Sequence, residues 1–461
     1  MDDSHVIEIT AWLMQSGLKG LAEADLLAGF CERCGQYGLP IERSVAVMDT
    51  LHPIYERRAF RWDSRQLVER ISEYGFSTPD NIADSWLRSA FHYLETEGVN
   101  EVRQHLDDVE PANDFYLLKE LRAEGFTDFV AMAHRFGDQG TIGEIDCFFS
   151  HFATRTAEGF SECDLKALRD LLPCLALAVK CVTVSGVAGT IAKVYLGQDA
   201  ANQVLHGKIT RGRSDRISAA LWFSDLANFT HISDTVDPEE IIPMLNDYAD
   251  AVISSIQEAG GEVLKLMGDG TLAIFRGRKP SEACAAALTA RALLDKRLAD
   301  LSAQRRIEGR PVTDVYLGLH LGDVFYGNIG SKDRLDFTVI GPAVNEVSRI
   351  VSLCRSLQRK VLMSASFAAI VPPTQIDNLL SIGQHVLRGV NRAQELFTLM
   401  PGLQKTSIDI WDPVAHASRF VDAFLLRISP KSDPDVGLDL GSDVETRLSC
   451  IRAVIHYQVS I

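Results

Sequence analysis

One apolar hairpin constrains the fold of this chain more than any other segment. Residues 260–275 read GGEVLKLMGDGTLAIF, in which two apolar stretches flank Gly268-Asp269-Gly270. The pattern predicts two antiparallel strands joined at an Asp-Gly turn. Asp269 can be a plain turn residue. Lys265, however, interrupts the first apolar stretch, where an unpaired ammonium group would be costly, and this favours a functional role for the hairpin.

A second carboxylate stands at the end of another predicted strand. Residues 217–230 read ISAALWFSDLANFT, a buried-type strand that ends at Ser224-Asp225. A carboxylate in this position can hold a metal ion while backbone N–H groups at the start of the next helix hold phosphate. Alone, Asp225 is more readily interpreted as an ordinary strand-end residue. Together with Asp269 it gives oxygen ligands that suit Mg²⁺ or Mn²⁺ rather than zinc.

The third segment, residues 315–354, predicts two strands followed by a helix. The helix should begin near Gly341-Pro342, because proline is favoured in a first helical turn. Asn345 and Arg349 lie four residues apart and therefore share one helix face. An amide beside a guanidinium suits a ribose and a phosphate. His320 lies within an apolar strand and is expected to be a core residue.

Taken in this order, the three segments resemble the catalytic domain of class III adenylyl and guanylyl cyclases. The matching motifs are FSDLANFT, GGEVLKLMGDGTLAIF, GLHLGDVFYGNIG and FTVIGPAVNEVSRI. The resemblance covers roughly residues 215–402, and it implies an α/β (α+β) domain of the ferredoxin-like βαββαβ type.

The resemblance also assigns roles to the metal- and base-binding positions. Asp225 and Asp269 match the ligands of two Mg²⁺ or Mn²⁺ ions per active site. Lys265 matches the lysine that selects the purine. Thr338 stands where many members carry an aspartate, as in the soluble bacterial class IIIb subgroup, and that subgroup raises an expectation of bicarbonate sensitivity.

The catalytic pair and the phosphate loop follow in the same way. Asn345 and Arg349 match the residues that orient the ribose and stabilise the transition state. In the family these two residues and the base-binding pair come from one subunit and the aspartates from the other, which implies a head-to-tail homodimer with shared sites. The loop whose backbone cradles the phosphates of ATP matches Leu226, Ala227, Asn228, Phe229 and Thr230.

One family position departs from the pattern. A lysine that meets the terminal phosphate in some members aligns with Val390. Arg388 and Arg392 are the candidate substitutes for this lysine, and Lys332 and Arg334 are further candidates for contact with the pyrophosphate.

The base-binding residues predict the substrate. Adenine offers an acceptor at N1 and a donor at N6, which Lys265 and the Thr338 hydroxyl complement, whereas the N–H donors of guanine would face Lys265 badly. The prediction is an adenylate cyclase that makes 3′,5′-cyclic AMP and pyrophosphate. The alternatives are a guanylate cyclase acting on GTP and an inactive cyclase-like module for nucleotide sensing or dimerisation.

Five segments are predicted along the chain. A helical segment (1–40) precedes a GAF-like α/β regulatory domain (41–185), in which aromatic residues form either a small-molecule pocket or a plain core. Strands are expected near 44–62, 126–134 and 145–152, mostly helix over 65–125, and a helix over 161–180 capped by Ser161. A helical linker (186–214), the catalytic domain (215–402) and a C-terminal extension of unknown role (403–461) follow.

Charge and composition limit the partners and the compartment. The net charge of −16 argues against nucleic acid or an anionic membrane as the main partner. Residues 171–192 are apolar but interrupted by Pro173 and Lys180, so we expect a buried helix rather than a membrane span. The odd count of nine cysteines, with an isolated Cys31/Cys34 pair and no basic, apolar leader, predicts a cytoplasmic protein.

Overall fold

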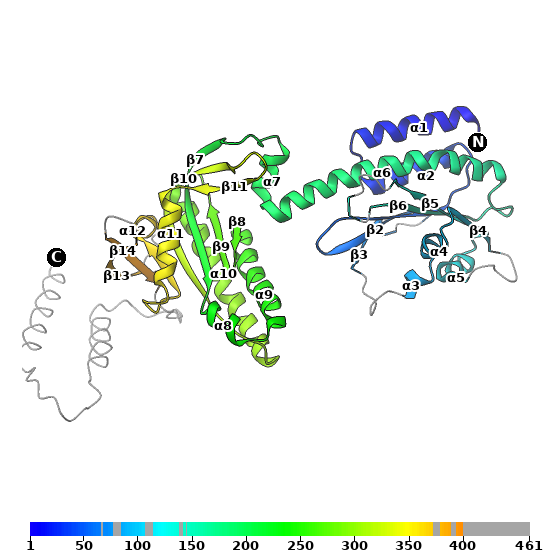
Figure 1. The fold of residues 1–461 in the computed structure, drawn as a ribbon. Helices are drawn as coiled ribbons and strands as arrows, with labels where there is room; N and C mark the ends of the chain where they lie inside the picture. The colour runs from blue at the N-terminus through cyan, green and yellow to red at the C-terminus, as the bar shows by residue number, and fades with distance from the viewer. Residues whose placement is uncertain are drawn as a thin grey trace, which may run out of the picture. The chain divides into compact units, whose positions relative to one another are not determined.

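The chain carries two β-sheets in a computed structural model, each with its own helices (Figure 1). The structure describes residues 1–65, 68–76, 84–106, 114–137, 142–143, 145–371, 379–388 and 393–399. The predicted C-terminal extension, 403–461, lies outside these residues.

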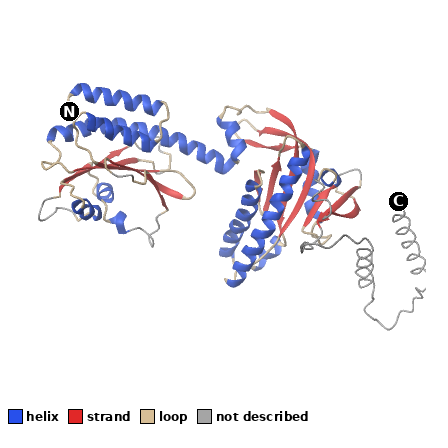
Figure 2. Cartoon of the chain, turned by 180° about the vertical axis from the view of Figure 1, so that it is seen from behind, coloured by secondary structure: helices blue, strands red, loops and turns tan. Residues whose placement is uncertain are grey.

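The first sheet is antiparallel and six-stranded, in the order β3-β2-β1-β6-β5-β4. It lies between two helical layers (Figure 2), each sealed by its own hydrophobic core. Its strands are β1 (Arg43–Asp49), β2 (Tyr55–Asp63), β3 (Ile71–Gly75), β4 (Glu101–His105), β5 (Asp128–Arg135) and β6 (Cys147–Thr154). One layer holds α1 (Asp3–Leu18), α2 (Glu23–Gln36) and α6 (Glu162–Leu196), and the other holds α3 (Asp84–Leu87), α4 (Ala90–Thr96) and α5 (Tyr116–Ala123).

The expectation of mostly helix over 65–125 is wrong. The two outermost strands of the sheet, β3 and β4, both fall in that range. Edge strands bury few side chains, and β3 has no buried residue, so their sequences carry little apolar alternation. The strands expected near 44–62, 126–134 and 145–152 are present as β1, β2, β5 and β6.

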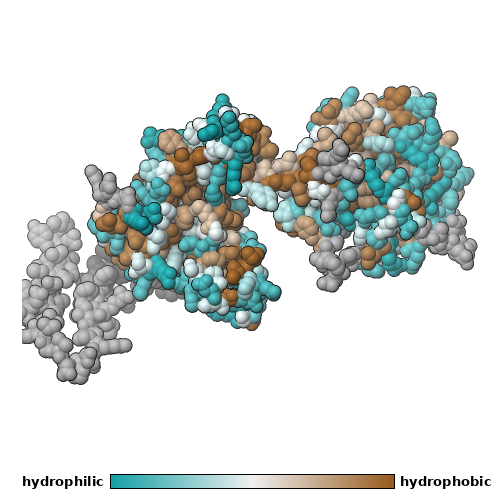
Figure 3. Space-filling view, in the orientation of Figure 1, coloured by the Kyte–Doolittle hydropathy of each residue, from teal (hydrophilic) through white to brown (hydrophobic). Residues whose placement is uncertain are grey.

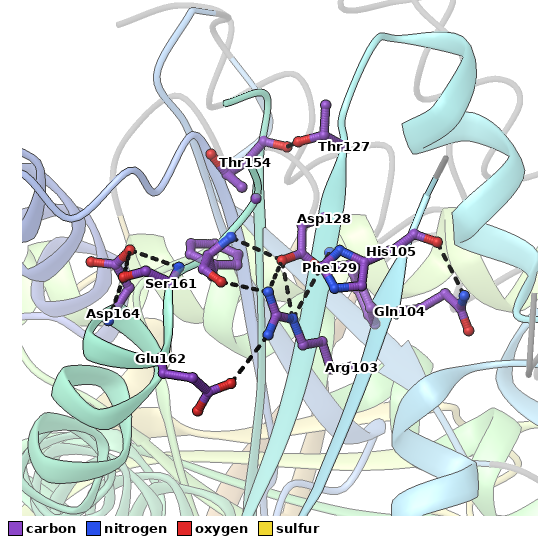
Figure 4. A network of polar contacts seen from close by, with 12 residues as sticks. Arg103, Gln104, His105, Thr127, Asp128, Phe129, Thr154, Ser161, Glu162 and Asp164 are labelled. Atoms are coloured by element: carbon purple, nitrogen blue, oxygen red, sulfur yellow. Dashed lines mark hydrogen bonds and ion pairs between the residues drawn. The ribbon is translucent and has the colours of Figure 1, made fainter. Parts of the chain in front are cut away.

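A buried polar network fixes the start of α6 to this sheet (Figure 4). The Asp128 carboxylate on β5 is fully buried and accepts hydrogen bonds from the Arg103 guanidinium (2.7 Å) and the Phe160 backbone N–H (2.9 Å). Ser161 and Asp164 then form the predicted capping box at the first turn of α6. The helix therefore begins at a fixed place on the sheet.

α6 is one unbroken helix of 35 residues, so the boundary predicted at 185/186 falls inside it. By length and composition alone it is the one described helix that could cross a membrane. Its inner face, with Leu168, Leu171 and Leu175, is buried against α1 and α2. Pro173 lies on the exposed face, where water can bond the carbonyl that a proline leaves free. After Gly197, α7 (Gln198–Leu205) completes the helical part of the predicted linker.

The second sheet has the βαββαβ order predicted for the catalytic domain. The strand order is β13-β14-β12-β10-β7-β9-β8, and β11 pairs with β10. The four strands of the motif, β7, β8, β9 and β10, are neighbours in this sheet. The elements are β7 (Ser214–Leu226), α8 (Phe229–Thr235), α9 (Pro238–Glu258), β8 (Glu262–Met267), β9 (Gly270–Phe275), α10 (Pro280–Ile307), β10 (Val315–Gly330), β11 (Leu335–Ile340), α11 (Pro342–Leu353), β12 (Val361–Ser364), α12 (Ala365–Ala368), β13 (Leu379–His385) and β14 (Gln394–Leu399).

The central strands β7 and β10 of this sheet are covered on both faces. α9 and α10 pack together over one face, where Trp222, Tyr248 and Phe275 form a buried core. α11 lies across β10 and β7, and its Val347 joins a separate core with Leu221. His320 of β10 is buried as expected, with its Nδ1 2.9 Å from the Ser364 hydroxyl.

Candidate active site

Asp225 and Asp269 lie side by side although they are distant in the sequence. Asp225 is near the end of β7, and Asp269 is in the turn between β8 and β9. β7 pairs with β9 through Ser224 and Thr271, which places the hairpin turn beside the end of β7. Both carboxylates line a hollow of about 210 Å³ that α9 closes on one side.

The electrostatics of the pair reflect this closeness. Burial, together with a hydrogen bond to Asp269 and the charge of that residue, raises the pKa of Asp225 to about 6. A hydrogen bond from the Leu226 backbone N–H has the opposite effect and lowers the pKa of Asp225. The site thus holds two adjacent acids that resist simultaneous ionisation unless a cation is present.

The chemistry of these donors fits hard divalent cations. The described residues contain no group of three or more histidines, cysteines or carboxylates that could hold a metal ion. Two carboxylates in an open hollow are, however, the protein ligands that Mg²⁺ commonly uses, with water and substrate phosphates completing its coordination. The mutual repulsion of Asp225 and Asp269 is the feature that a bound cation would relieve.

The loop after Asp225 offers fewer backbone donors than expected. The Ala227 N–H already donates to the Asp314 carbonyl at 2.7 Å. Asn228 adopts a left-handed conformation (φ 58°), and α8 begins at Phe229 with no side-chain cap on its first N–H groups. Of the predicted residues 226–230, the last three therefore have the geometry to donate to an anion.

Lys265 departs from its predicted environment. β8 is the last strand of the sheet, and the Lys265 side chain is 44% exposed rather than buried in an apolar strand. Its ammonium donates to Asp336 on β11, a residue that the sequence analysis missed. Thr338, two residues further along β11, shares a face with Asp336 because strand residues alternate.

Asn345 and Arg349 project from α11 into solvent. Both are exposed, and among the described residues neither side chain has a hydrogen-bond or ion-pair partner; only their backbone carbonyls accept, from the hydroxyls of Ser348 and Ser352. Gly341, whose φ of 150° favours glycine, is the N-cap of α11, and Pro342 is the first residue of the helix, as predicted.

Two glycines of β10 set the position of this helix. A Cβ on Gly318 would lie 2.9 Å from the Val347 carbonyl oxygen, and a Cβ on Gly322 would lie 2.6 Å from the Ala343 Cβ. The missing side chains let α11 approach the sheet closely enough to hold Asn345 and Arg349 at one place.

The remaining basic candidates are exposed or lie outside the description. Lys332, Arg334 and Arg388 are exposed, and none of them is held in an ion pair among the described residues. Val390 and Arg392 lie outside the described residues.

Within one chain the predicted residues are not joined into one bonded site. In the described part of the chain, no hydrogen bond or ion pair joins Asp225 or Asp269 to Lys265, Asn345 or Arg349. Apolar side chains that are more than a third exposed border both groups. They are Ile242, Leu266 and Met267 near the acid pair, and Phe325, Leu335 and Ile340 on β10 and β11.

Comparison with known proteins agrees with these motifs. Residues 212–401 match the family "Adenylate and Guanylate cyclase catalytic domain". An adenylate cyclase of Anabaena cylindrica is 37% identical over 144 residues, which cover 31% of this chain and 29% of that protein. Adenylate cyclase 1 of Rhizobium meliloti (strain 1021) is 30% identical over 152 residues, covering 32% and 22%. The chain thus spans less than a third of the length of these curated relatives.

Solved structures of both kinds of cyclase are also similar. The adenylyl cyclase CyaB from P. aeruginosa is 23% identical, with 42% of this chain and all of that chain covered and a TM-score of 0.37. The guanylyl cyclase Cya2 is 24% identical, with 42% and 97% covered and a TM-score of 0.36. At these TM-scores the likeness adds no support for either substrate.

Proposed function

We propose that this chain, whose residues 212–401 form a class III adenylyl/guanylyl cyclase catalytic domain, is an adenylate cyclase that converts ATP to 3′,5′-cyclic AMP and pyrophosphate. The observation that carries the proposal is the adjacency of Asp225 and Asp269 in a domain that also presents Asn345 and Arg349 without partners. The first pair would hold cations, and the second would hold the ribose and the reacting phosphate.

The residues divide the chemistry among them. Asp225 and Asp269 would hold two Mg²⁺ or Mn²⁺ ions, which would lower the pKa of the ribose 3′-hydroxyl and neutralise the triphosphate. The N–H groups of Asn228, Phe229 and Thr230 would orient the phosphates. On α11, Asn345 would fix the ribose and Arg349 would neutralise charge that develops at the α-phosphate.

The active form is proposed to be a head-to-tail homodimer. Within the described part of one chain no hydrogen bond or ion pair joins the acid pair to Lys265, Asn345 or Arg349, and each site would take the acid pair from one subunit and these three residues from the other. The exposed apolar side chains beside both groups support this arrangement, because a partner subunit would cover them.

ATP is the proposed substrate, and the Lys265–Asp336 pair keeps GTP as the second candidate. The Lys265 ammonium and the Thr338 hydroxyl complement N1 and N6 of adenine. The same ammonium and the Asp336 carboxylate also complement O6 and N1–H of guanine. The two curated relatives named as adenylate cyclases favour ATP.

A turnover assay on the purified chain tests the reaction and its substrate. With Mn²⁺ and equal ATP and GTP, cyclic AMP should be the main product. Asp336→Asn tests whether Asp336 binds guanine. If it does, the variant should lose more GTP turnover than ATP turnover. Dominant cyclic GMP in the unmodified protein would refute the choice of ATP, and no cyclic nucleotide would refute the reaction.

Mixing two inactive variants tests the shared site. Asp225→Ala and Arg349→Ala should each be inactive alone. In an equimolar mixture with free exchange, about half of the dimers are mixed and each has one whole site of two, so about a quarter of the normal activity should return. An inactive mixture, with subunit exchange verified by tagged chains, would contradict the homodimer.

The N-terminal sheet is proposed to be a GAF-like regulatory domain that binds a small molecule. Its support is the antiparallel sheet enclosed between two helical layers, with α6 leading from it towards the catalytic domain. A change in cyclase activity on adding a ligand, lost when residues 1–185 are removed, would test this role.

A further inference from the structure

A second cavity of the catalytic domain is lined by none of the residues proposed to bind the nucleotide or the metal ions. It lies between β10, the start of α11, α12 and the hairpin of β13 and β14, and its volume is about 710 Å³. Figure 1 shows α11, α12 and this hairpin close together on one side of the second sheet, and Figure 3 shows hydrophilic and apolar residues mixed over the surface of this domain that faces the viewer. The volume is that of a small-molecule pocket.

The buried His320 side chain faces this cavity with one ring nitrogen unbonded. His320 is 6% exposed, and its Nδ1 lies 2.9 Å from the Ser364 hydroxyl. Its Nε2 makes no hydrogen bond within the described part of the chain, and the Glu346 carboxylate lies 3.6 Å away. A Cβ on Gly322 would lie 2.9 Å from Nε2, so the glycine leaves room beside this nitrogen. A buried ring nitrogen without a partner lowers stability unless a ligand or water bonds it.

Two carboxylates give the cavity an uncompensated negative charge. Glu346 accepts a hydrogen bond from the Gln394 amide at 3.0 Å, and Glu395 accepts one from the Ser381 hydroxyl at 2.6 Å. Neither carboxylate forms an ion pair with a lysine or an arginine among the residues that the structure describes. Because neutral donors do not cancel a charge, both groups remain available to a cation.

The other ionisable groups of the cavity do not neutralise these two carboxylates. Arg216 and Asp323 pair with each other at 2.8 Å. Burial lowers the pKa of His320, so its imidazole is neutral at pH 7 and offers Nε2 as a hydrogen-bonding atom rather than a charge. The lining therefore holds three carboxylates against one guanidinium, which disfavours anions such as nucleotide phosphates.

We infer that this cavity is a site for a small organic cation, whose ammonium or guanidinium group is held by Glu346 and Glu395 beside Nε2 of His320. Such a group donates several hydrogen bonds, so it can bond a carboxylate and an unprotonated ring nitrogen together. Among the described residues, no three histidine, cysteine or carboxylate groups are placed to hold a bare metal ion, so an organic cation is the better occupant.

The cavity also contacts the helix that carries two proposed catalytic residues. Pro342 and Ala343 in the first turn of α11 line it, and Glu346 directly follows Asn345 on the same helix. A cation bound to Glu346 therefore acts on the element that holds Asn345 and Arg349, and its binding should be coupled to the position of α11. The consequence for turnover rests on the proposed function, whereas the binding site does not.

Isothermal titration calorimetry of the full-length protein with agmatine tests the site. Agmatine carries an ammonium and a guanidinium group, and 4-guanidinobutanoate, in which a carboxylate replaces the ammonium, is the matched probe. Agmatine should bind at a single site per chain and about tenfold or more tightly than 4-guanidinobutanoate, because Glu346 and Glu395 repel the added carboxylate. No binding of agmatine, or equal affinity for the two probes, would overturn the inference.

Three substitutions locate the bound agmatine. Glu346→Gln keeps the side-chain size and an acceptor for Gln394, and it should weaken binding about tenfold or more because a charge-assisted contact is lost. Ala365→Leu fills part of the cavity without changing its charge and should also weaken binding. Asp225→Asn removes a carboxylate from the proposed metal site and should leave the affinity nearly unchanged. Unchanged affinity in Glu346→Gln, or a loss in Asp225→Asn instead, would place agmatine elsewhere and contradict the assignment.

Hydrogen exchange tests the coupling to α11 without any need for turnover. Agmatine should slow amide exchange in α11 about threefold or more while leaving exchange in α1 unchanged. Equal exchange in α11 with and without agmatine would overturn the coupling.

Turnover separates this inference from the proposed function. With ATP and Mn²⁺, saturating agmatine should change kcat about twofold or more in the unmodified protein and not in Glu346→Gln. An unchanged kcat in the unmodified protein would overturn the link to catalysis. If the protein makes no cyclic nucleotide with or without agmatine, the proposed reaction fails, while calorimetry and hydrogen exchange still decide the site and its coupling.

Discussion

Divalent-metal binding should depend on pH through a single carboxyl group, Asp225. Burial and the neighbouring Asp269 raise the pKa of Asp225 to about 6, so the group carries a proton below that pH and must release it to bind a cation. The ionised fraction falls from about nine-tenths at pH 7 to about one-tenth at pH 5. The apparent dissociation constant for Mn²⁺ should therefore rise about tenfold between these two pH values.

Electron paramagnetic resonance of free Mn²⁺ measures this constant directly in the full-length protein without nucleotide. Asp336→Asn removes a carboxylate elsewhere in the same domain and should keep the tenfold change, whereas Asp269→Asn should weaken binding at every pH. Because the pKa of Asp225 is raised in the folded protein, metal binding should weaken as the pH falls, and not strengthen. A dissociation constant that stays flat from pH 5 to 7 would show that Asp225 is ionised throughout and that the two carboxylates are not adjacent.

Three further outcomes are expected. Arg103→Met removes the guanidinium from the buried Asp128 carboxylate, which keeps only His105 and two backbone N–H groups as partners, and should lower the free energy of unfolding in urea by about 3–5 kcal/mol. Arg169→Met at a more exposed pair should lower it by less than about 1 kcal/mol, and equal losses would contradict the role of burial. Gly318→Ala places a Cβ 2.9 Å from the Val347 carbonyl and should reduce kcat about tenfold or more, whereas Gly186→Ala, in open space, should not; an unaffected kcat would mean that α11 tolerates displacement. Burial raises the pKa of both Cys31 and Cys34, so a thiol reagent should modify Cys163 and Cys181 in the native protein and leave the first two intact until urea is added.

The parts of the fold that the sequence predicted well are those with strong local patterns. The Asp-Gly hairpin, the Ser161 capping box and the start of α11 at Gly341-Pro342 each depend on a few neighbouring residues, and all three are present. The edge strands β3 and β4 were missed because their side chains are largely exposed and their identity depends on pairing with distant strands.

In the candidate site too, the features set by neighbouring residues were predictable and those set by distant strand pairing were not. The types and order of Asp225, Asp269, Asn345 and Arg349 are visible in the sequence, but the closeness of the two aspartates depends on the pairing of β7 with β9. The environment of Lys265 was misjudged because the sequence does not reveal that β8 is the last strand of the sheet. Asp336 was missed, although alternation along β11 places it on the same face as Thr338 and could have identified it.

Because α6 is one continuous helix, its length determines how the chain that follows it is rotated about the helix axis. A helix turns by about 100° per residue, so inserting a single residue between Leu177 and Gly197 would rotate everything downstream by that angle. Inserting seven residues would add nearly two complete turns and restore the facing to within about 20°. Natural variation in this helix should therefore tolerate many changes of residue type while permitting changes of length only in steps of a heptad.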